Sequence, residues 1–203
     1  MGYFPFYIDI ENKKCVVVGG GVVALRKIEK ILPFNPEITV VAPEICREIE
    51  EINDIELHRR SFLDSDISDA FTVIAATDDN NLNARIFELC QKKNILINTV
   101  DDKEKCGFIF PALVKKQNIT VGISTEGKSP IYARFLREKI ESSLDENCDK
   151  AIDILSSVRD LIKREIDTEE NRKLAFERIL KLCITDINEV NNDKIFEIIN
   201  DLK

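Results

Sequence analysis

The feature that most constrains the fold is a glycine-rich turn near the amino terminus. Residues 15–27 read CVVVGGGVVALRK, so a run of valines leads into Gly19, Gly20 and Gly21 and then into a segment with helical periodicity. This pattern predicts a buried strand, a tight turn and a helix start, the local plan of a dinucleotide-binding βαβ unit. Gly19, Gly21 and Ala24 occupy the three small-residue positions of G-x-G-x-x-A. On this motif alone, a turn that binds no ligand stays open as the alternative.

Each position of the motif requires a small residue for a physical reason. Gly19 permits the turn, and Gly21 has no Cβ to hold a pyrophosphate away from the backbone. Ala24 lets the helix lie close to the strand. The unpaired N–H groups at the helix start would face the phosphates, supported by the positive end of the helix dipole.

The following segments alternate between strand and helix patterns. Strands are expected at 37–41, 55–59, 72–76 and 95–100, and helices at 22–32 and 82–92. Such alternation is typical of a parallel sheet with helices on both faces. Because the carboxyl ends of parallel strands meet at one edge, Thr77 and Asp78 should border the cofactor crevice. Asp78 and Asp79 also have an ordinary role available, as caps of the next helix.

The end of the second strand bears on the choice of cofactor. NAD-specific folds often carry an acidic residue there that binds the ribose hydroxyls. Here the strand is followed by Ala42 and Pro43, and Glu44 comes slightly late. No arginine at this edge suggests a site for a 2′-phosphate, so the sequence favours NAD over NADP.

The second half of the chain has a different character. Extended segments are expected at 108–114 and 119–124, and Ser129-Pro130 is a strong helix start. That helix should run to about residue 144 and carry Arg134 and Arg137 on one face. Glycine is absent after Gly127, and the remaining residues have only helical periodicity; one expected apolar helix face consists of Leu174, Ile179, Leu180 and Leu182.

Composition excludes several functional classes. The formal net charge of −8 argues against nucleic acid or an anionic membrane as a partner. No apolar run approaches the roughly 18–20 residues that span a bilayer, and the amino terminus lacks a secretory signal pattern. The six cysteines form no C-x-x-C pair and His58 is the single histidine, so neither a disulfide framework nor a metal site is expected. These features predict a cytoplasmic protein.

Longer pieces of the sequence match a known family. They are VVVGGGVVALRK (16–27), ITVVAPE (38–44), VIAATDDNNLNARI (73–86), NTVDD (98–102), FIFPALV (108–114) and VGISTEGKSPIYARFLREKIE (121–141). In these pieces, the chain resembles the N-terminal precorrin-2 dehydrogenase module of sirohaem synthases and its stand-alone relatives. In some relatives, the module also inserts Fe²⁺ to give sirohaem.

The resemblance implies NAD-dependent oxidation of precorrin-2 to sirohydrochlorin, by a homodimer whose ligand is an acidic tetrapyrrole. With no methyltransferase domain following, the chain would perform only these late steps. The expected fold is α/β: a Rossmann-like NAD-binding domain (1–112), a small α+β dimerisation region (113–145) and a helical C-terminal domain (146–203). Iron insertion stays open, since many chelatases use histidines near the metal path and His58 is expected away from the crevice.

The resemblance also implies roles for particular residues. Gly21, Val22 and Val23 fall on the cofactor contacts of the turn, and Pro43 and Glu44 on those of the second strand. Asp101 aligns with the family's catalytic acid/base, and its place at a strand's carboxyl end supports that role. Asp102 is its neighbour or a turn cap. The alternative for this acidic pair is a solvated loop.

Substrate carboxylates are expected to bind at the helix that begins with Ser129-Pro130. The candidate residues are Ser129, Arg134 and Arg137, and the alternative for the two arginines is an ordinary surface role. Glu126 is a departure from the family's small pair before this helix, and its charge would repel an acidic substrate if it faced the pocket. The competing reading of the whole chain is an NAD-binding regulatory or sensor domain without catalysis.

Overall fold

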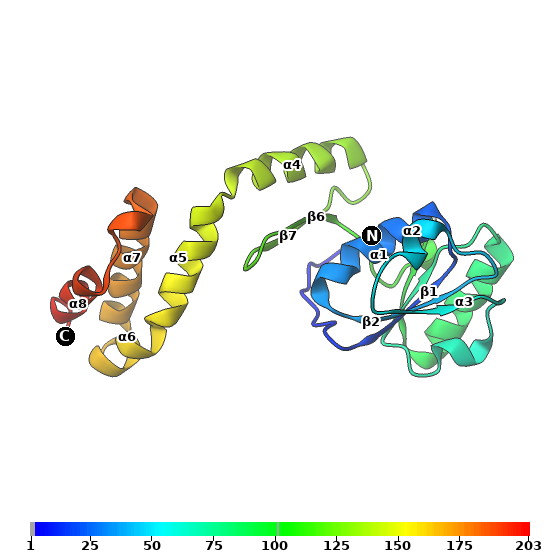
Figure 1. The fold of residues 1–203 in the computed structure, drawn as a ribbon, viewed down its shortest axis with the longest axis horizontal. Helices are drawn as coiled ribbons and strands as arrows, with labels where there is room; N and C mark the ends of the chain where they lie inside the picture. Colours follow the sequence, from blue (N-terminus) through cyan, green and yellow to red (C-terminus); the bar gives the residue numbers. More distant parts are fainter. Residues whose placement is uncertain (1–2, 101) are drawn as a thin grey trace. The chain divides into compact units, whose positions relative to one another are not determined.

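The computed structural model describes residues 3–100 and 102–203, with only the backbone of Lys103 (Figure 1). The chain forms two compact units, one ending at Pro111 and the other spanning Ala112–Lys203. The division of the second unit into a dimerisation region and a helical domain stays a prediction. Each unit is built around its own elements.

The first unit contains a parallel sheet of five strands. They are β1 (Lys14–Val18), β2 (Glu37–Val41), β3 (Ile55–His58), β4 (Thr72–Ala75) and β5 (Leu96–Thr99), in the order β3-β2-β1-β4-β5. Val18, the last residue of β1, is paired with Val41 on one side and Ala75 on the other. The strand order reverses between β1 and β4, and this is where ligands bind in open α/β sheets. The Rossmann-like fold is confirmed.

Alternation along β1 builds a core on each face of the sheet. Cys15 and Val17 belong to one apolar cluster, and Val16 and Val18 to the other. Helices α1 (Val22–Ile31) and α2 (Arg47–Glu50) cover the first face, and α3 (Asn80–Lys93) with the 3₁₀ turn η2 (Asp64–Ile67) covers the second (Figure 1). The glycine turn therefore joins a fully buried strand to a helix packed on it.

Two expected helix bounds need correction. Helix α3 begins at Asn80 rather than at 82, because the Asp79 carboxylate accepts hydrogen bonds from the N–H groups of Asn81 and Leu82 at 2.9 and 3.1 Å. Helix α1 ends at Ile31, and the chain continues as the 3₁₀ turn η1 (Leu32–Phe34), which accommodates Pro33 in its first turn.

The second unit opens with a hairpin and a helix. Strands β6 (Ala112–Lys115) and β7 (Thr120–Ile123) pair antiparallel, and α4 (Pro130–Ser143) follows and packs on them. The expected strand at 108–114 starts only at Ala112, since Pro111 has no N–H group to donate to a ladder. The helix start was predicted correctly: the Ser129 hydroxyl accepts a hydrogen bond from Tyr132 N–H at 3.2 Å.

The tail of the chain encloses a third apolar cluster. Its elements are α5 (Glu146–Ser157), α6 (Arg159–Glu165), α7 (Glu169–Thr185), the 3₁₀ turn η4 (Ile187–Glu189) and α8 (Asn192–Asn200). The predicted core face of α7 was partly wrong: Leu174 and Leu180 are 36% and 39% exposed. The buried stripe is Ala175, Ile179 and Cys183, four residues apart. Among the described residues, no helix could cross a bilayer.

Candidate functional site

The glycine turn after β1 lies wedged between the segments that follow β2 and β4. Gly19 has a φ of +120°, and a Cβ there would lie 2.2 Å from the carbonyl oxygen of Ala76. A Cβ on Gly20 would lie 2.2 Å from the carbonyl oxygen of Glu44, and Gly20 accepts a hydrogen bond from Cys46 N–H at 2.8 Å. The turn, Glu44 and Thr77 are thus brought to one edge of the sheet, as the sequence predicted.

The start of α1 is open. Gly21 is its N-cap residue, and a Cβ added there would meet nothing within 4 Å. The first turn contains no acidic residue, and the Val22 and Val23 side chains are 58% and 40% exposed. Unpaired N–H groups at such a helix start bind anions well. The residues present therefore fit the pyrophosphate of a dinucleotide. Pro43 and Glu44 are exposed beside this turn.

Asn83 holds the Thr77 end of this edge in place. Its side chain is buried, its Oδ1 accepts a hydrogen bond from Thr77 Oγ1 at 2.7 Å, and its Nδ2 donates to the Thr77 carbonyl at 2.8 Å. Sequence reasoning missed Asn83, and the signal was a polar residue inside an apolar helical face. Of the two candidate caps, Asp79 is the cap and Asp78 is exposed.

Asn83→Ala is expected to lower the free energy of unfolding by about 2 kcal/mol, because Thr77 would lose the hydrogen bonds that it makes with the buried Asn83 side chain. Asn81→Ala, two residues earlier at an exposed position of the same helix, should change the free energy of unfolding by less than about 0.5 kcal/mol. Urea unfolding of both variants measures the difference. Equal effects would show that Asn83 does not hold the Thr77 turn.

A cavity of about 800 Å³ lies at the carboxyl end of β5. Val23 of α1, Asn98, Val100, Asp102 and Phe110 are among its lining residues. Asp101, the predicted catalytic residue, lies outside the described residues. Its chain neighbours Val100 and Asp102 both line this cavity, which also reaches the first turn of α1 at Val23.

Asp102 has a structural role in the described part of this loop. Its carboxylate caps the 3₁₀ turn η3 (Lys103–Lys105), accepting a hydrogen bond from Glu104 N–H at 3.1 Å and pairing with Lys105 Nζ at 2.7 Å. The Lys105 ammonium group lowers the pKa of Asp102. Asp102 therefore stays ionised and engaged in its own loop, which makes it a poor proton acceptor.

Cys106 and Asn98 secure the two ends of the same loop. The Cys106 thiol lies 3.2 Å from the Thr99 carbonyl oxygen and 3.1 Å from that of Asp102, and burial raises its pKa. Asn98 Nδ2 donates to the Phe108 carbonyl at 3.0 Å. Asn98 Oδ1 and Thr99 Oγ1 are buried and have no hydrogen-bond partner among the described residues. Unpaired buried polar atoms of this kind are what a ligand or water can satisfy.

The predicted substrate residues all lie in the second unit. Ser129 caps α4, whereas both arginines pair with carboxylates of their own helix. Arg134 Nε lies 2.9 Å from Glu138 Oε1, and an Arg137 guanidinium nitrogen lies 2.6 Å from Glu141 Oε2. Glu126 has a φ of +53° and faces Lys128 at 3.6 Å. Substrate binding by Ser129, Arg134 and Arg137 stays a prediction.

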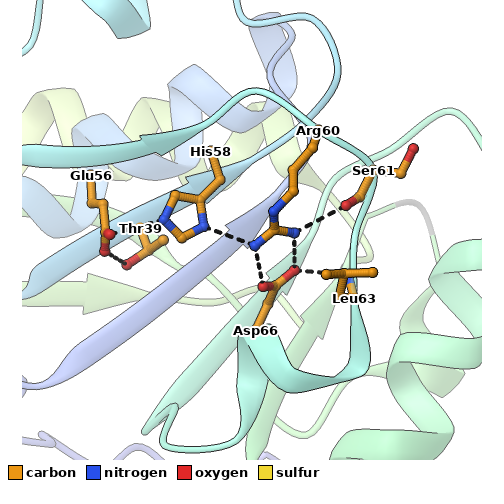
Figure 2. Close-up of polar contacts among 7 residues, drawn as sticks. All are labelled: Thr39, Glu56, His58, Arg60, Ser61, Leu63 and Asp66. Atoms are coloured by element: carbon orange, nitrogen blue, oxygen red, sulfur yellow. Dashed lines mark hydrogen bonds and ion pairs between the residues drawn. The ribbon is translucent and has the colours of Figure 1, made fainter.

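His58 belongs to a polar network at the end of β3 (Figure 2). Its Nε2 lies 2.9 Å from Glu56 Oε1, and its Nδ1 lies 3.1 Å from an Arg60 nitrogen. Because Arg60 can only donate, Nδ1 accepts and Nε2 carries the proton of a neutral imidazole. Arg60 in turn binds both oxygens of Asp66, at 2.6 and 2.8 Å. Within the described residues, no three His, Cys, Asp or Glu side chains gather as metal ligands.

Asp66→Asn is expected to lower the free energy of unfolding by about 2 kcal/mol at pH 7. The Asp66 side chain is only 6% exposed, and the substitution removes the negative charge that accepts the hydrogen bonds from Arg60. The hydrogen bonds from Arg60 lower the pKa of Asp66 below its unfolded value. This stabilisation is therefore complete above the unfolded pKa of about 4 and is lost as the pH falls through the lower folded value.

Denaturant unfolding between pH 7 and pH 2 measures this effect. The difference between the wild-type protein and Asp66→Asn should shrink as the pH approaches the folded pKa. Asp64→Asn removes a more exposed carboxylate, which pairs with Arg85 at 2.6 Å, and serves as the matched control with little effect. A gap between wild type and Asp66→Asn that stays constant with pH would contradict the assigned role.

The sheet order, the glycine turn and the open helix start together define a dinucleotide-binding domain of the Rossmann class. The family model described as "Putative NAD(P)-binding" matches residues 6–112, and the chain belongs to that family. A second model, described as "Sirohaem biosynthesis protein central", matches residues 116–143. These matches support NAD as the cofactor and confirm the kinship with sirohaem-synthesis proteins expected from the sequence.

Individual proteins agree with the family models. The chain is 37% identical over 190 residues to a siroheme synthase of Thioalkalivibrio sulfidiphilus, covering 92% of this chain and 39% of that protein. It is 39% identical over 182 residues to a siroheme synthase of Blochmanniella pennsylvanica, covering 88% and 38%. The chain thus spans about two fifths of these relatives. A solved structure of SirC, a precorrin-2 dehydrogenase, matches with a TM-score of 0.79 and 25% identity, covering 98% of each chain.

Proposed function

We propose that this protein oxidises precorrin-2 to sirohydrochlorin with NAD⁺, as a step of sirohaem biosynthesis. The observation that carries the proposal is the likeness to a precorrin-2 dehydrogenase over 98% of both chains. It is supported by the open start of α1 and the cavity at the end of β5, which share Val23. A regulatory NAD-binding domain without catalysis would not account for the sirohaem-protein match at 116–143.

In the proposed mechanism, the protein positions the two reactants and takes up a proton. When bound, NAD⁺ would supply the hydride acceptor for this oxidation. The first-turn N–H groups of α1 would hold its pyrophosphate, and the bare Cα of Gly21 would leave room for it. The other residues that would contact the cofactor are Gly19, Val22, Val23, Pro43, Glu44, Thr77 and Asp78. Asp101 accepts the proton released with the hydride. Asp102 and Cys106 shape the loop that carries it.

The cofactor should be NAD rather than NADP, with at least about tenfold tighter binding by calorimetry. The three arginines after β2 and β3 are each paired at 2.6 Å with a carboxylate: Arg47 with Glu51, Arg59 with Glu50, and Arg60 with Asp66. A 2′-phosphate would meet the exposed Glu44 and no uncommitted guanidinium on this segment. Equal affinity for the two cofactors would contradict this assignment.

We further propose that the protein is a cytoplasmic homodimer. The α4 helix carries exposed Ile131 (85%), Tyr132 (55%) and Phe135 (53%), an apolar surface of the kind that subunit contacts cover. The six cysteines are free thiols, which suits a reducing compartment. Light scattering of the wild-type protein and of an Ile131→Asp variant tests the dimer, which the variant should weaken.

The activity is tested with purified protein, precorrin-2 and NAD⁺, with NADH and sirohydrochlorin both measured. Formation of both products in equal amounts is expected, and absence of sirohydrochlorin would refute the proposal. A parallel reaction with Fe²⁺ measures iron insertion, which stays open as a second activity.

A further inference from the structure

One face of α1 is basic and turned toward the cavity at the end of β5. Four residues of this helix line the cavity: Val23, Arg26, Lys27 and Lys30. The three basic residues follow Val23 by three, four and seven positions, so all four share one side of the helix. Arg26 is exposed and forms no ion pair with any residue that the structure describes. Three cations therefore gather at one cavity of a chain whose net charge is −8.

Lys30 is the most informative of these cations. It is half-buried, and its recorded contacts are neutral: the Pro111 carbonyl oxygen at 3.4 Å and the Phe110 ring at 5.8 Å. Burial lowers its pKa. Charged groups removed from water usually have an ionic partner. No carboxylate of the described residues lies within ion-pair distance of Lys30, so an anionic ligand would supply that partner.

Phe110 adds an aromatic surface between two ammonium groups. Lys27 Nζ lies 4.5 Å from the centre of its ring, and the ring also packs on Phe108 at 5.4 Å. The cavity contains two acidic residues as well, but Asp102 is paired with Lys105, and Glu29 is exposed. The combination of an aromatic surface with cations on its rim suits a large flat molecule that carries carboxylates at its edge.

We propose that the basic face of α1, formed by Arg26, Lys27 and Lys30 with Phe110, binds the peripheral carboxylates and the apolar body of the polyacidic macrocycle. The inference rests on the proposed function, since it assigns the place where the substrate of that reaction binds. It differs from the expectation at α4, where Arg134 and Arg137 already have carboxylate partners. Binding here also sets the macrocycle beside Val23 and the loop of Val100 and Asp102.

The test uses uroporphyrin, a porphyrin with eight carboxylates, whose fluorescence reports binding to the full-length protein without turnover. Arg26→Gln and Lys30→Gln should each weaken its binding about tenfold, and the double variant about a hundredfold, while NAD titrations stay unchanged. Lys92→Gln, an exposed lysine in the last turn of α3 outside this cavity, is the matched control and should bind uroporphyrin as the wild-type protein does.

Two outcomes would overturn the inference: unchanged uroporphyrin affinity in the folded double variant, or loss of NAD affinity with uroporphyrin binding intact, which would assign this face to the cofactor. Circular dichroism verifies that each variant is folded. A wild-type protein that binds uroporphyrin through this face but produces no sirohydrochlorin would refute the proposed function and leave the polyacid site standing. The two failures are therefore distinguishable.

Discussion

Asp101→Asn should lower kcat by roughly 10²–10⁴-fold while leaving NAD affinity unchanged. The amide has nearly the shape of the carboxylate but cannot accept the proton that leaves the macrocycle with the hydride. Because the proposed pyrophosphate site is the turn at Gly19–Gly21 with the start of α1, NAD binding should not depend on this side chain. Steady-state rates with precorrin-2 and NAD titrations by calorimetry measure the two quantities separately.

The matched control is the neighbouring carboxylate. Asp102→Asn removes the ion pair with Lys105 at 2.7 Å but keeps an oxygen that can cap η3. Its kcat should fall less than about tenfold, and mainly through looser placement of the loop. If Asp102→Asn were as damaging as Asp101→Asn, or if Asp101→Asn retained full turnover, Asp101 would not be the proton acceptor.

Gly21→Ala should weaken cofactor binding without disturbing the fold. A Cβ at Gly21 meets no protein atom within 4 Å, and the residue has a φ of −92°, which alanine adopts freely. We therefore expect the free energy of unfolding to change by no more than about 1 kcal/mol, the usual cost of alanine at an N-cap. The added methyl group occupies the space assigned to the pyrophosphate, so NAD affinity should fall at least about tenfold.

Gly19→Ala, in contrast, should destabilise the fold itself. Its φ of +120° strains any L-residue, and the new Cβ would lie 2.2 Å from a backbone oxygen of Ala76 that cannot move away cheaply. A loss of about 3 kcal/mol or more in unfolding free energy is expected. Thermal and urea unfolding with parallel NAD titration measure both variants. Gly21→Ala protein that binds NAD normally would refute the pyrophosphate assignment.

Local sequence patterns predicted the strands and helices of the first unit well. The valines of β1 are fully buried because a parallel strand covered on both faces needs apolar residues at every position. Ser129-Pro130 predicted the start of α4 for an equally local reason, since capping depends on residues three apart. By contrast, the core face of α7 was partly wrong, because which stripe is buried depends on the helices that pack against it.

Some residues of the candidate site could likewise be identified from local sequence, and others could not. Gly19 and Gly21 could be chosen as candidates from sequence, because Gly19 has a φ of +120° that favours glycine and Gly21 leaves room for a ligand where other residues carry a Cβ. Asn83 could not be identified in this way, since its role depends on its hydrogen bonds with Thr77, which form only when the chain has folded. Arg26, Lys27 and Lys30 read in sequence as the solvated side of an amphipathic helix.

The sequence by itself determined that this chain makes a Rossmann-like sheet with a dinucleotide turn, since strand composition, glycines and caps act over a few residues. Only the tertiary structure decided that the turn is wedged between the ends of β2 and β4, and that the basic side of α1 and Phe110 lie against each other and line one cavity. The physical reason is that the sheet order β3-β2-β1-β4-β5 joins segments far apart in the chain. The charge and the burial of side chains at this edge of the sheet therefore depend on the folded structure.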